Sequence, residues 1–168
     1  EGAKNFGQYW HGNEPNNHAI YCYNYVGQPY KTAELIRRVL DLEYTNDTQG
    51  ISGNEDAGQM SAWYVFSALG FYPFVHSVPQ YVIGTPLFDK ATLNLSGGKV
   101  IITAKNNSAE NKYIQSMTIN GKPWDKNWFP HTLLQSGGTI DFVMGPKPST
   151  WGTAPESRPF SITPAVKK

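Results

Sequence analysis

The hydrophobic pattern of this chain changes near Pro73, and that change constrains the fold more than any other feature. Before Pro73, apolar residues recur at the spacing of a helical face, over residues 18–25, 32–42 and 58–69. After Pro73, alternating or β-branched runs predict short strands at residues 81–83, 91–95, 99–104, 113–119 and 139–143. The order of elements therefore predicts an α+β fold, with helices in residues 1–75 and a β-rich region in residues 76–168.

Turn and cap residues support these boundaries. Gly27 and Gly70 follow apolar runs as helix-ending glycines, and Pro29 suits the first turn of the next helix. Asn120-Gly121 lies between two strand-like runs and is typical of a tight hairpin. The β-rich region is therefore predicted to be an antiparallel, sandwich-like layer. The stretch from Lys147 onward is rich in Pro, Ser and Thr and is predicted to be extended or loosely ordered.

The predicted helix over residues 58–69 is apolar on nearly every side, with Met60, Trp63 and Leu69 among its large side chains. A helix of this kind is buried from most directions. Three helices are too few to bury it. The sequence therefore predicts that the chain is part of a larger enzyme, with further helices supplied by polypeptide outside it.

Composition excludes several classes of function. The formal net charge of the 168 residues is +1, and Lys and Arg are scattered, so a nucleic-acid partner is not expected. No apolar run approaches the roughly 20 residues that span a bilayer, so no membrane span is expected. Cys22 is the only cysteine, which excludes an internal disulfide. Because it lies in an apolar stretch, it is predicted to be a small buried hydrophobe.

Two short segments concentrate the reactive groups of the chain. They are His11-Gly-Asn-Glu-Pro15 and Gly53-Asn-Glu-Asp-Ala57, and each precedes a predicted helix. Together they supply three carboxylates and two amides, from Asn13, Glu14, Asn54, Glu55 and Asp56. Such groups are oxygen ligands for a hard cation and can act in acid/base chemistry.

A structural role explains each segment taken alone. Glu14 and Pro15 suit a first helical turn, and Asp56 suits an N-cap. The coincidence of two such segments favours a site, because clustered carboxylates repel one another without a cation, and neither segment contains Lys or Arg. Ca²⁺ is the predicted cation, although no EF-hand loop is present.

The two histidines near these segments do not favour zinc over calcium. His11 and His18 lack the further Cys or His ligands of a zinc site. His11 either contacts substrate or forms a structural hydrogen bond, and the sequence leaves both roles open.

Residues 7–32 and 51–73, which contain these segments, resemble two long motifs of glycoside hydrolase family 92, the calcium-dependent exo-acting α-mannosidases. The resemblance implies the last helices of an (α/α)₆ toroid followed by closing β-structure. It also implies inverting hydrolysis of terminal α-mannosides on mannose-containing glycans, outside the cell or in the periplasm. The rest of the enzyme, including the general acid, would lie in the N-terminal part of the same polypeptide.

The resemblance also implies roles for individual residues. Asp56 matches the family's general base, and Asn54 matches a position where many members carry an assisting Asp. Asn13, Glu14 and Asp56 match the calcium-binding region, and His11 and Gly12 match a region that contacts substrate. Gly12 lacks the side chain that accompanies α-1,2 specificity, which argues against that linkage without selecting another.

Two other functions compete with this interpretation. The β-rich region could be a non-catalytic carbohydrate-binding or accessory module, with a sugar platform of Tyr113, Trp124, Trp128 and Phe129. Alternatively, the chain could be a processed structural part of a larger complex.

Overall fold

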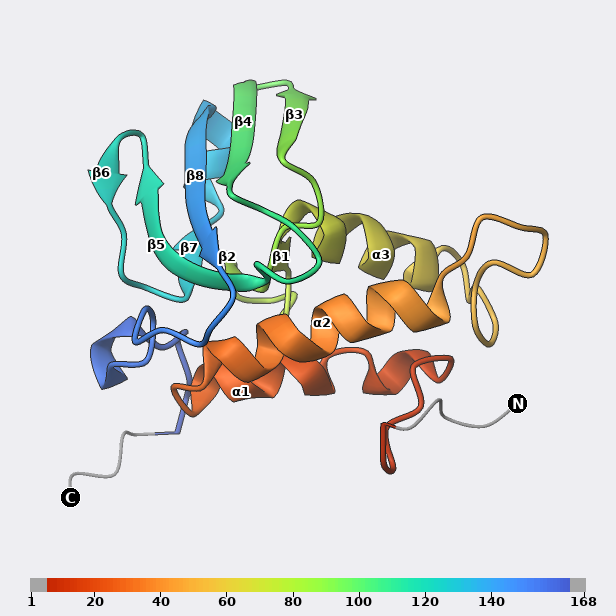
Figure 1. Cartoon of the computed structure of the whole chain (residues 1–168). Coiled ribbons are helices and arrows are strands. Elements are labelled where there is room, and N and C mark those ends of the chain that lie inside the picture. Colours follow the sequence, from red (N-terminus) through yellow and green to blue (C-terminus); the bar gives the residue numbers. More distant parts are fainter. Residues whose placement is uncertain (1–5, 164–168) are drawn as a thin grey trace.

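The computed structural model describes residues 6–163, which form a small group of helices and two β-sheets (Figure 1). Two 3₁₀ turns, η1 (Glu14–Asn16) and η2 (Ala19–Tyr21), lead into the short helix α1 (Cys22–Tyr25). The longer helices are α2 (Pro29–Glu43) and α3 (Gln59–Leu69). The helix predicted over 18–25 is thus confirmed only in part, because its first half is a 3₁₀ turn.

Helix α2 lies at the centre of the fold. It runs between α1 and the strands (Figure 1), and its side chains Ile36, Val39 and Leu40 are buried. Pro29 opens the helix, as predicted, because proline needs no intrahelical partner in the first turn. The helical part has its own apolar core, which Trp63, Tyr21 and Tyr72 join. No helix within residues 6–163 is long and apolar enough to cross a membrane.

The strands form two sheets. The smaller sheet has the order β1-β2-β7, from β1 (Phe71–Tyr72), β2 (Gln80–Ile83) and β7 (Trp128–Pro130). The larger sheet has the order β3-β4-β8-β5-β6, from β3 (Lys90–Leu95), β4 (Gly98–Lys105), β5 (Tyr113–Ile119), β6 (Lys122–Pro123) and β8 (Gly138–Gly145). All five predicted strands are present, and mixed α and β structure is confirmed.

The prediction that the layer is antiparallel is wrong for one pair, because β4 and β8 run parallel. A parallel pair needs a long crossover connection. Here the chain passes through β5, β6, β7 and the short helix α4 (Thr132–Ser136) before β8 inserts between β4 and β5. The short strands β1 and β7 and the helix α4 carry no clear periodicity and were not predicted. The hairpin at Asn120-Gly121 is confirmed, with φ of 50° and 73° and the pair Ile119↔Lys122.

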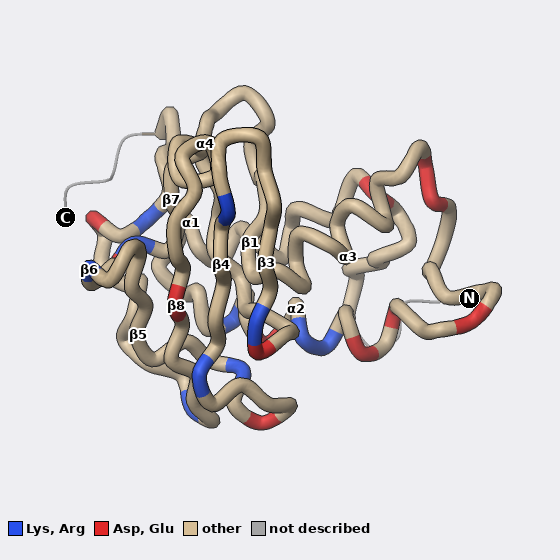
Figure 2. The backbone as a smooth tube through the Cα atoms, turned by 90° about the horizontal axis from the view of Figure 1, so that it is seen from above, with Lys and Arg blue, Asp and Glu red and all other residues tan. Residues whose placement is uncertain are grey.

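The two sheets share one apolar core, to which Phe71 and Phe129 contribute from the smaller sheet and Ile140 and Phe142 from the larger. Figure 2 shows the strands gathered at one end of the molecule and α3, with the loop before it, at the other. β1 precedes the predicted boundary at residue 75 and pairs with β2 beyond it. The division into residues 1–75 and 76–168 stays a prediction.

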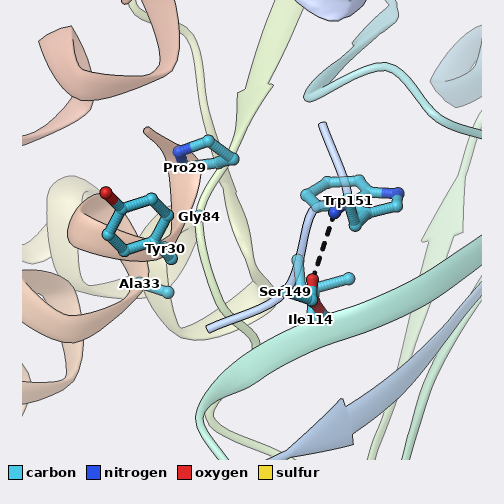
Figure 3. A pocket seen from close by; sticks show the side chains of 7 residues that line it. All are labelled: Pro29, Tyr30, Ala33, Gly84, Ile114, Ser149 and Trp151. Atoms are coloured by element: carbon cyan, nitrogen blue, oxygen red, sulfur yellow. Dashed lines mark hydrogen bonds between the residues drawn. The ribbon is translucent and has the colours of Figure 1, made fainter. Parts of the chain in front are cut away.

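The segment after β8 packs against the helices instead of lying loosely on the surface. Trp151 is buried and its indole Nε1–H donates to the carbonyl oxygen of Trp124 at 2.8 Å. Figure 3 shows Trp151 and Ser149 facing Pro29 and Tyr30 of α2. The gap between them is about 10 Å³, room for one water molecule at most. The segment includes a last 3₁₀ turn, η3 (Pro155–Ser157).

Buried amides tie the helices to the strands. The Asn24 side chain donates to the carbonyl oxygens of Ile83 and Asn127, at 2.8 and 3.2 Å. The Asn127 side chain donates to the carbonyl oxygens of Asn24 and Gly152, at 3.1 and 2.8 Å. Because both residues are fully buried, these bonds fix α1 against β2 and the C-terminal segment.

The prediction that Cys22 is buried is wrong, because its side chain is exposed. The turn from η2 into α1 directs Ile20, Tyr21 and Asn24 inward, and Cys22 falls on the other side. A short, apolar-rich run does not by itself say which of its residues face the core.

Candidate functional site

The two predicted segments lie against each other through their glycines. A Cβ atom added to Gly12 would lie 2.9 Å from the Cα of Gly53, and one added to Gly53 would collide with the carbonyl oxygen of Gly12. Gly53 also has a φ of 70°, which side chains other than glycine rarely adopt. Two residues 41 positions apart therefore meet because neither has a side chain.

His11 anchors the first segment beside this contact. Its ring is buried, and it packs edge-on against Trp63 with 4.3 Å between ring centroids. Tyr9 Oη lies 2.7 Å from Nδ1, and Tyr44 Oη lies 2.7 Å from Nε2. Tyr44 also donates to the carbonyl oxygen of Met60 at 3.0 Å.

One assignment of protons satisfies all these bonds. The hydroxyl hydrogen of Tyr44 goes to Met60, so Tyr44 can only accept from His11, which carries its proton on Nε2. Nδ1 then accepts from the hydroxyl of Tyr9. Desolvation lowers the pKa of His11 to about 4, so the ring is neutral near pH 7.

His11 thus connects its own segment to the end of α2 and the start of α3, through Tyr44 and Met60. Burial also raises the pKa of Tyr9 and of Tyr44, so both remain protonated hydrogen-bond donors. A substrate contact for His11 stays a prediction. Both of its ring nitrogens are already engaged by tyrosines.

The second segment makes a tight turn before α3. Asp56 and Ala57 have positive φ values of 46° and 57°, which are uncommon for residues other than glycine. Asp56 was predicted as the N-cap, and this is wrong, because Gly58 holds that position. The Glu55 carboxylate caps the helix instead, accepting from the Ser61 backbone N–H at 3.0 Å and from its hydroxyl at 2.8 Å.

Because Glu55 makes these hydrogen bonds to α3, the Asp56 carboxylate is not used to hold the helix. Asp56 and Asn54 are both exposed, and neither side chain has a hydrogen bond to another described residue. The side chains of Asn13 and Glu14 are partly exposed and likewise have no such bond within residues 6–163. Four side chains with unused oxygen atoms therefore flank the Gly12–Gly53 contact.

The predicted calcium donors agree in chemistry with a hard cation. Asn13, Glu14 and Asp56 offer one amide oxygen and two carboxylates, and Ca²⁺ binds such oxygens together with water. Within residues 6–163, no three or more His, Cys, Asp or Glu side chains gather into a metal-binding group. The described residues thus fit a site that is completed by amide oxygens, water or further ligands, and they do not fit zinc.

Asn17 is a further residue that holds this region together. It is fully buried, its backbone oxygen accepts from the Trp63 indole at 3.1 Å, and its amide nitrogen lies 3.2 Å from the Met60 sulfur. Its side-chain oxygen has no partner among the described residues. Asn17 therefore fixes the chain after Glu14 against α3.

The aromatic residues of the suggested sugar platform are mostly engaged elsewhere. Phe129 is fully buried in the core. The ammonium of Lys126 lies over Trp124 and Trp128, 5.7 and 5.0 Å from their ring centroids. The Trp124 indole donates to the carbonyl oxygen of Trp128 at 2.8 Å. These contacts make a flat, open sugar platform at this place unfavourable.

Comparisons with known proteins agree with the motifs. The model of the glycosyl hydrolase family 92 catalytic domain matches residues 1–146. An uncharacterized secreted glycosidase of Arthroderma benhamiae is 31% identical over 161 residues, which cover 94% of this chain and 21% of that protein.

Solved structures of two mannosidases from Bacteroides thetaiotaomicron are also similar. A family GH92 α-mannosidase is 40% identical with a TM-score of 0.92, over 96% of this chain and 22% of that one. A family GH92 inverting mannosidase is 45% identical with a TM-score of 0.87, over 94% of this chain and 22% of that one.

The chain therefore spans about a fifth of the length of the relatives that it matches. The family match covers both motifs, the helices α1 to α4 and strands β1 to β8. The predicted resemblance is confirmed: the chain belongs to glycosyl hydrolase family 92 and corresponds to part of its catalytic domain.

Proposed function

We propose that this chain is the C-terminal part of an inverting, calcium-dependent exo-α-mannosidase that removes terminal α-mannose from glycans. The observation that carries the proposal is the contact of Gly12 with Gly53, which gathers side chains with unused oxygens from two distant segments. The similarity to α-mannosidases, one of them described as inverting, supports the substrate class and stereochemistry.

Asp56 acts as the general base in this proposal. It takes a proton from the attacking water, and Asn54 donates a hydrogen bond that orients the same water but cannot remove its proton. The carboxylate of Asp56 is exposed, lies in a strained turn and has no partner among the described residues. Inversion also requires an acid on the opposite face of the sugar. We assign that acid to the remaining N-terminal part of the polypeptide.

Asn13, Glu14 and Asp56 hold calcium in this proposal, and their oxygen donors suit it. When bound, the ion supplies Lewis-acid and template chemistry for the sugar hydroxyls. The two segments that carry these residues are held in place, because His11 and Asn17 fix the first segment and Glu55 fixes the second. In this proposal the backbone at His11 and Gly12 borders the substrate, with the Trp10 indole beside Gly12, and the buried His11 ring holds that backbone in place.

The same proposal places the helices and strands of this chain within a larger catalytic domain. The helices are the last ones of an (α/α)₆ toroid, and the strands are a sandwich-like layer that closes it. α3 leaves Val65 exposed, which suits a helix that meets further helices. A secreted relative supports a place outside the cell or in the periplasm.

The decisive experiment compares two neighbouring carboxylates in the full-length polypeptide, with an aryl α-mannoside and calcium. Asp56→Asn should lower kcat by about 10²- to 10⁴-fold, the usual contribution of a general base, and leave KM nearly unchanged. Glu55→Gln is the matched control and should lower kcat far less, because Glu55 caps α3. Equal effects of both variants, or an unchanged kcat for Asp56→Asn, would contradict the assignment.

A further inference from the structure

Trp10 places a large, exposed ring directly beside the contact between the two motif segments. Its side chain is 45% exposed. Its indole Nε1 lies 3.0 Å from the position that a Cβ atom on Gly12 would take, and the Cα of Gly53 lies 2.9 Å from the same position. The indole therefore occupies space that a side chain on Gly12 would need.

The backbone holds this ring close to a proposed calcium donor. The N–H of Asn13 donates to the carbonyl oxygen of Trp10 at 3.2 Å, which closes a tight turn over His11 and Gly12. The buried ring of His11 anchors the middle of this turn through both of its nitrogen atoms. Trp10 and Asn13 are thus the two ends of one fixed turn.

The Trp10 indole is not used to hold the described part of the chain together. Within residues 6–163, its ring has no aromatic or cationic partner and its Nε1–H has no acceptor. By contrast, the indoles of Trp63, Trp124 and Trp151 donate to backbone oxygens at 3.1, 2.8 and 2.8 Å. The ring face and the N–H donor of Trp10 therefore remain for a ligand.

An indole suits a sugar ring. Its flat apolar face covers the C–H bonds on one face of a pyranose, and its N–H donates to a hydroxyl at the edge. The side chains of Asn13, Glu14, Asn54 and Asp56 are polar, and they suit hydroxyl groups, water and a cation. Trp10 therefore supplies an apolar contact that these four side chains cannot make.

The leaving sugar is the ring that this contact suits best. In the proposed reaction, the calcium donors and the base act on the terminal mannose through its hydroxyls and the attacking water, so polar groups hold that ring. An exo-acting enzyme keeps the terminal sugar innermost, because the rest of the glycan must extend into solvent. A half-exposed indole beside the polar cluster suits the next sugar along the glycan.

We propose that Trp10 determines the leaving-group preference of this enzyme, by stacking on the sugar to which the terminal α-mannose is attached. Gly12 makes room for the indole because it has no side chain. The inference rests on the proposed function, since it takes an α-mannoside to bind beside the two segments. It adds the class of the leaving group, a pyranose ring, and the residue that selects it.

Two substrates that differ only in the leaving group test the proposal in the full-length polypeptide with calcium. One is the α-linked mannobiose that the parent cleaves fastest, and the other is α-mannosyl fluoride, whose leaving group has no ring. Trp10→Ala should lower kcat/KM for the mannobiose by at least about tenfold and leave kcat/KM for the fluoride within about twofold. Trp10→Phe keeps a flat ring and should recover most of the loss.

Phe88→Ala is the matched control, because Phe88 is 48% exposed and lies outside both motif segments. It should leave kcat/KM for both substrates within about twofold of the parent. Equal losses with the two substrates in Trp10→Ala, together with a lowered Tm, would mean that the indole packs on other polypeptide. That result would overturn the proposal.

A binding measurement separates this proposal from the catalytic one. In an Asp56→Asn background at saturating calcium, calorimetry should show that Trp10→Ala weakens mannobiose binding by at least about tenfold and leaves mannose binding unchanged. A parent that hydrolyses neither substrate would contradict the proposed function, and this titration would still test Trp10. Unchanged mannobiose affinity in Trp10→Ala, or no mannobiose binding with Trp10 in place, would overturn the role of Trp10.

Discussion

At the scale of single residues, His11 and Asp56 occupy environments that their sequence context does not reveal. His11 lies in a motif from which a substrate contact is predicted, yet its ring is buried between Tyr9 and Tyr44. Asp56 has the context of a helix cap, yet Gly58 is the N-cap and the Glu55 carboxylate accepts from the first turn of α3. The local pattern predicted a functional cluster, but the choice between neighbours depends on turn geometry. It also depends on Tyr44, a partner 33 positions from His11.

The burial of His11 makes stability depend on pH. Its pKa in the folded protein is about 4, below the ordinary value of about 6.5 that applies when the chain is unfolded. The unfolded chain therefore binds an extra proton as the pH falls, and stability is lost between about pH 6.5 and 4. The loss is at most about 3.5 kcal/mol, from about 1.4 kcal/mol for each pKa unit.

Urea unfolding of the full-length polypeptide at pH 7 and pH 4.5 measures this loss. His11→Phe should remove the histidine's share of the difference between the two pH values. His18→Phe, at an exposed position, should leave it in place. An identical pH dependence in the parent and in His11→Phe would show that His11 does not titrate on unfolding.

At the scale of elements, periodicity predicted the long helices and the five longer strands, because each has enough residues to display a face. It did not predict β1, β7 or α4, which are two, three and five residues long. Nor could it predict that β8 pairs parallel with β4, since that pairing depends on how a long connection crosses the sheet. Periodicity could not predict the contact between the segments around Gly12 and Gly53 either, because it depends on tertiary packing.

The Gly12–Gly53 contact can be tested with two glycines that have nearly the same positive φ, Gly53 at 70° and Gly7 at 68°. Gly53→Ala should destabilise the protein by about 2–4 kcal/mol, from a positive φ and a collision with the Gly12 backbone. Gly7→Ala is the control, with a φ of 68° and no atom within 4 Å of the added Cβ, and should cost only about 1–2 kcal/mol. Urea midpoints that shift equally in both variants would mean that the two segments are not in tight contact.

At the scale of the whole molecule, the chain is a helical part and a β part fastened by Asn24, Asn127 and the segment around Trp151. The proposed site lies at the opposite end from the strands, where the acidic loops gather (Figure 2). In the proposed assignment, the base and the calcium donors lie within this chain, and the acid lies in the remaining polypeptide. The sequence motifs predicted that incomplete site, and its geometry comes from the packing of two distant segments.

Calcium titration of the full-length polypeptide by isothermal calorimetry tests this central claim most directly. Glu14→Gln and Asp56→Asn should each weaken calcium binding by at least about tenfold, the lower range for loss of an outer-shell partner. The double variant should lose less than the sum of the two free-energy changes, because both side chains hold one ion. Glu55→Gln should bind calcium as the parent does. Unchanged affinity in both Glu14→Gln and Asp56→Asn would contradict the claim that these segments form one metal site.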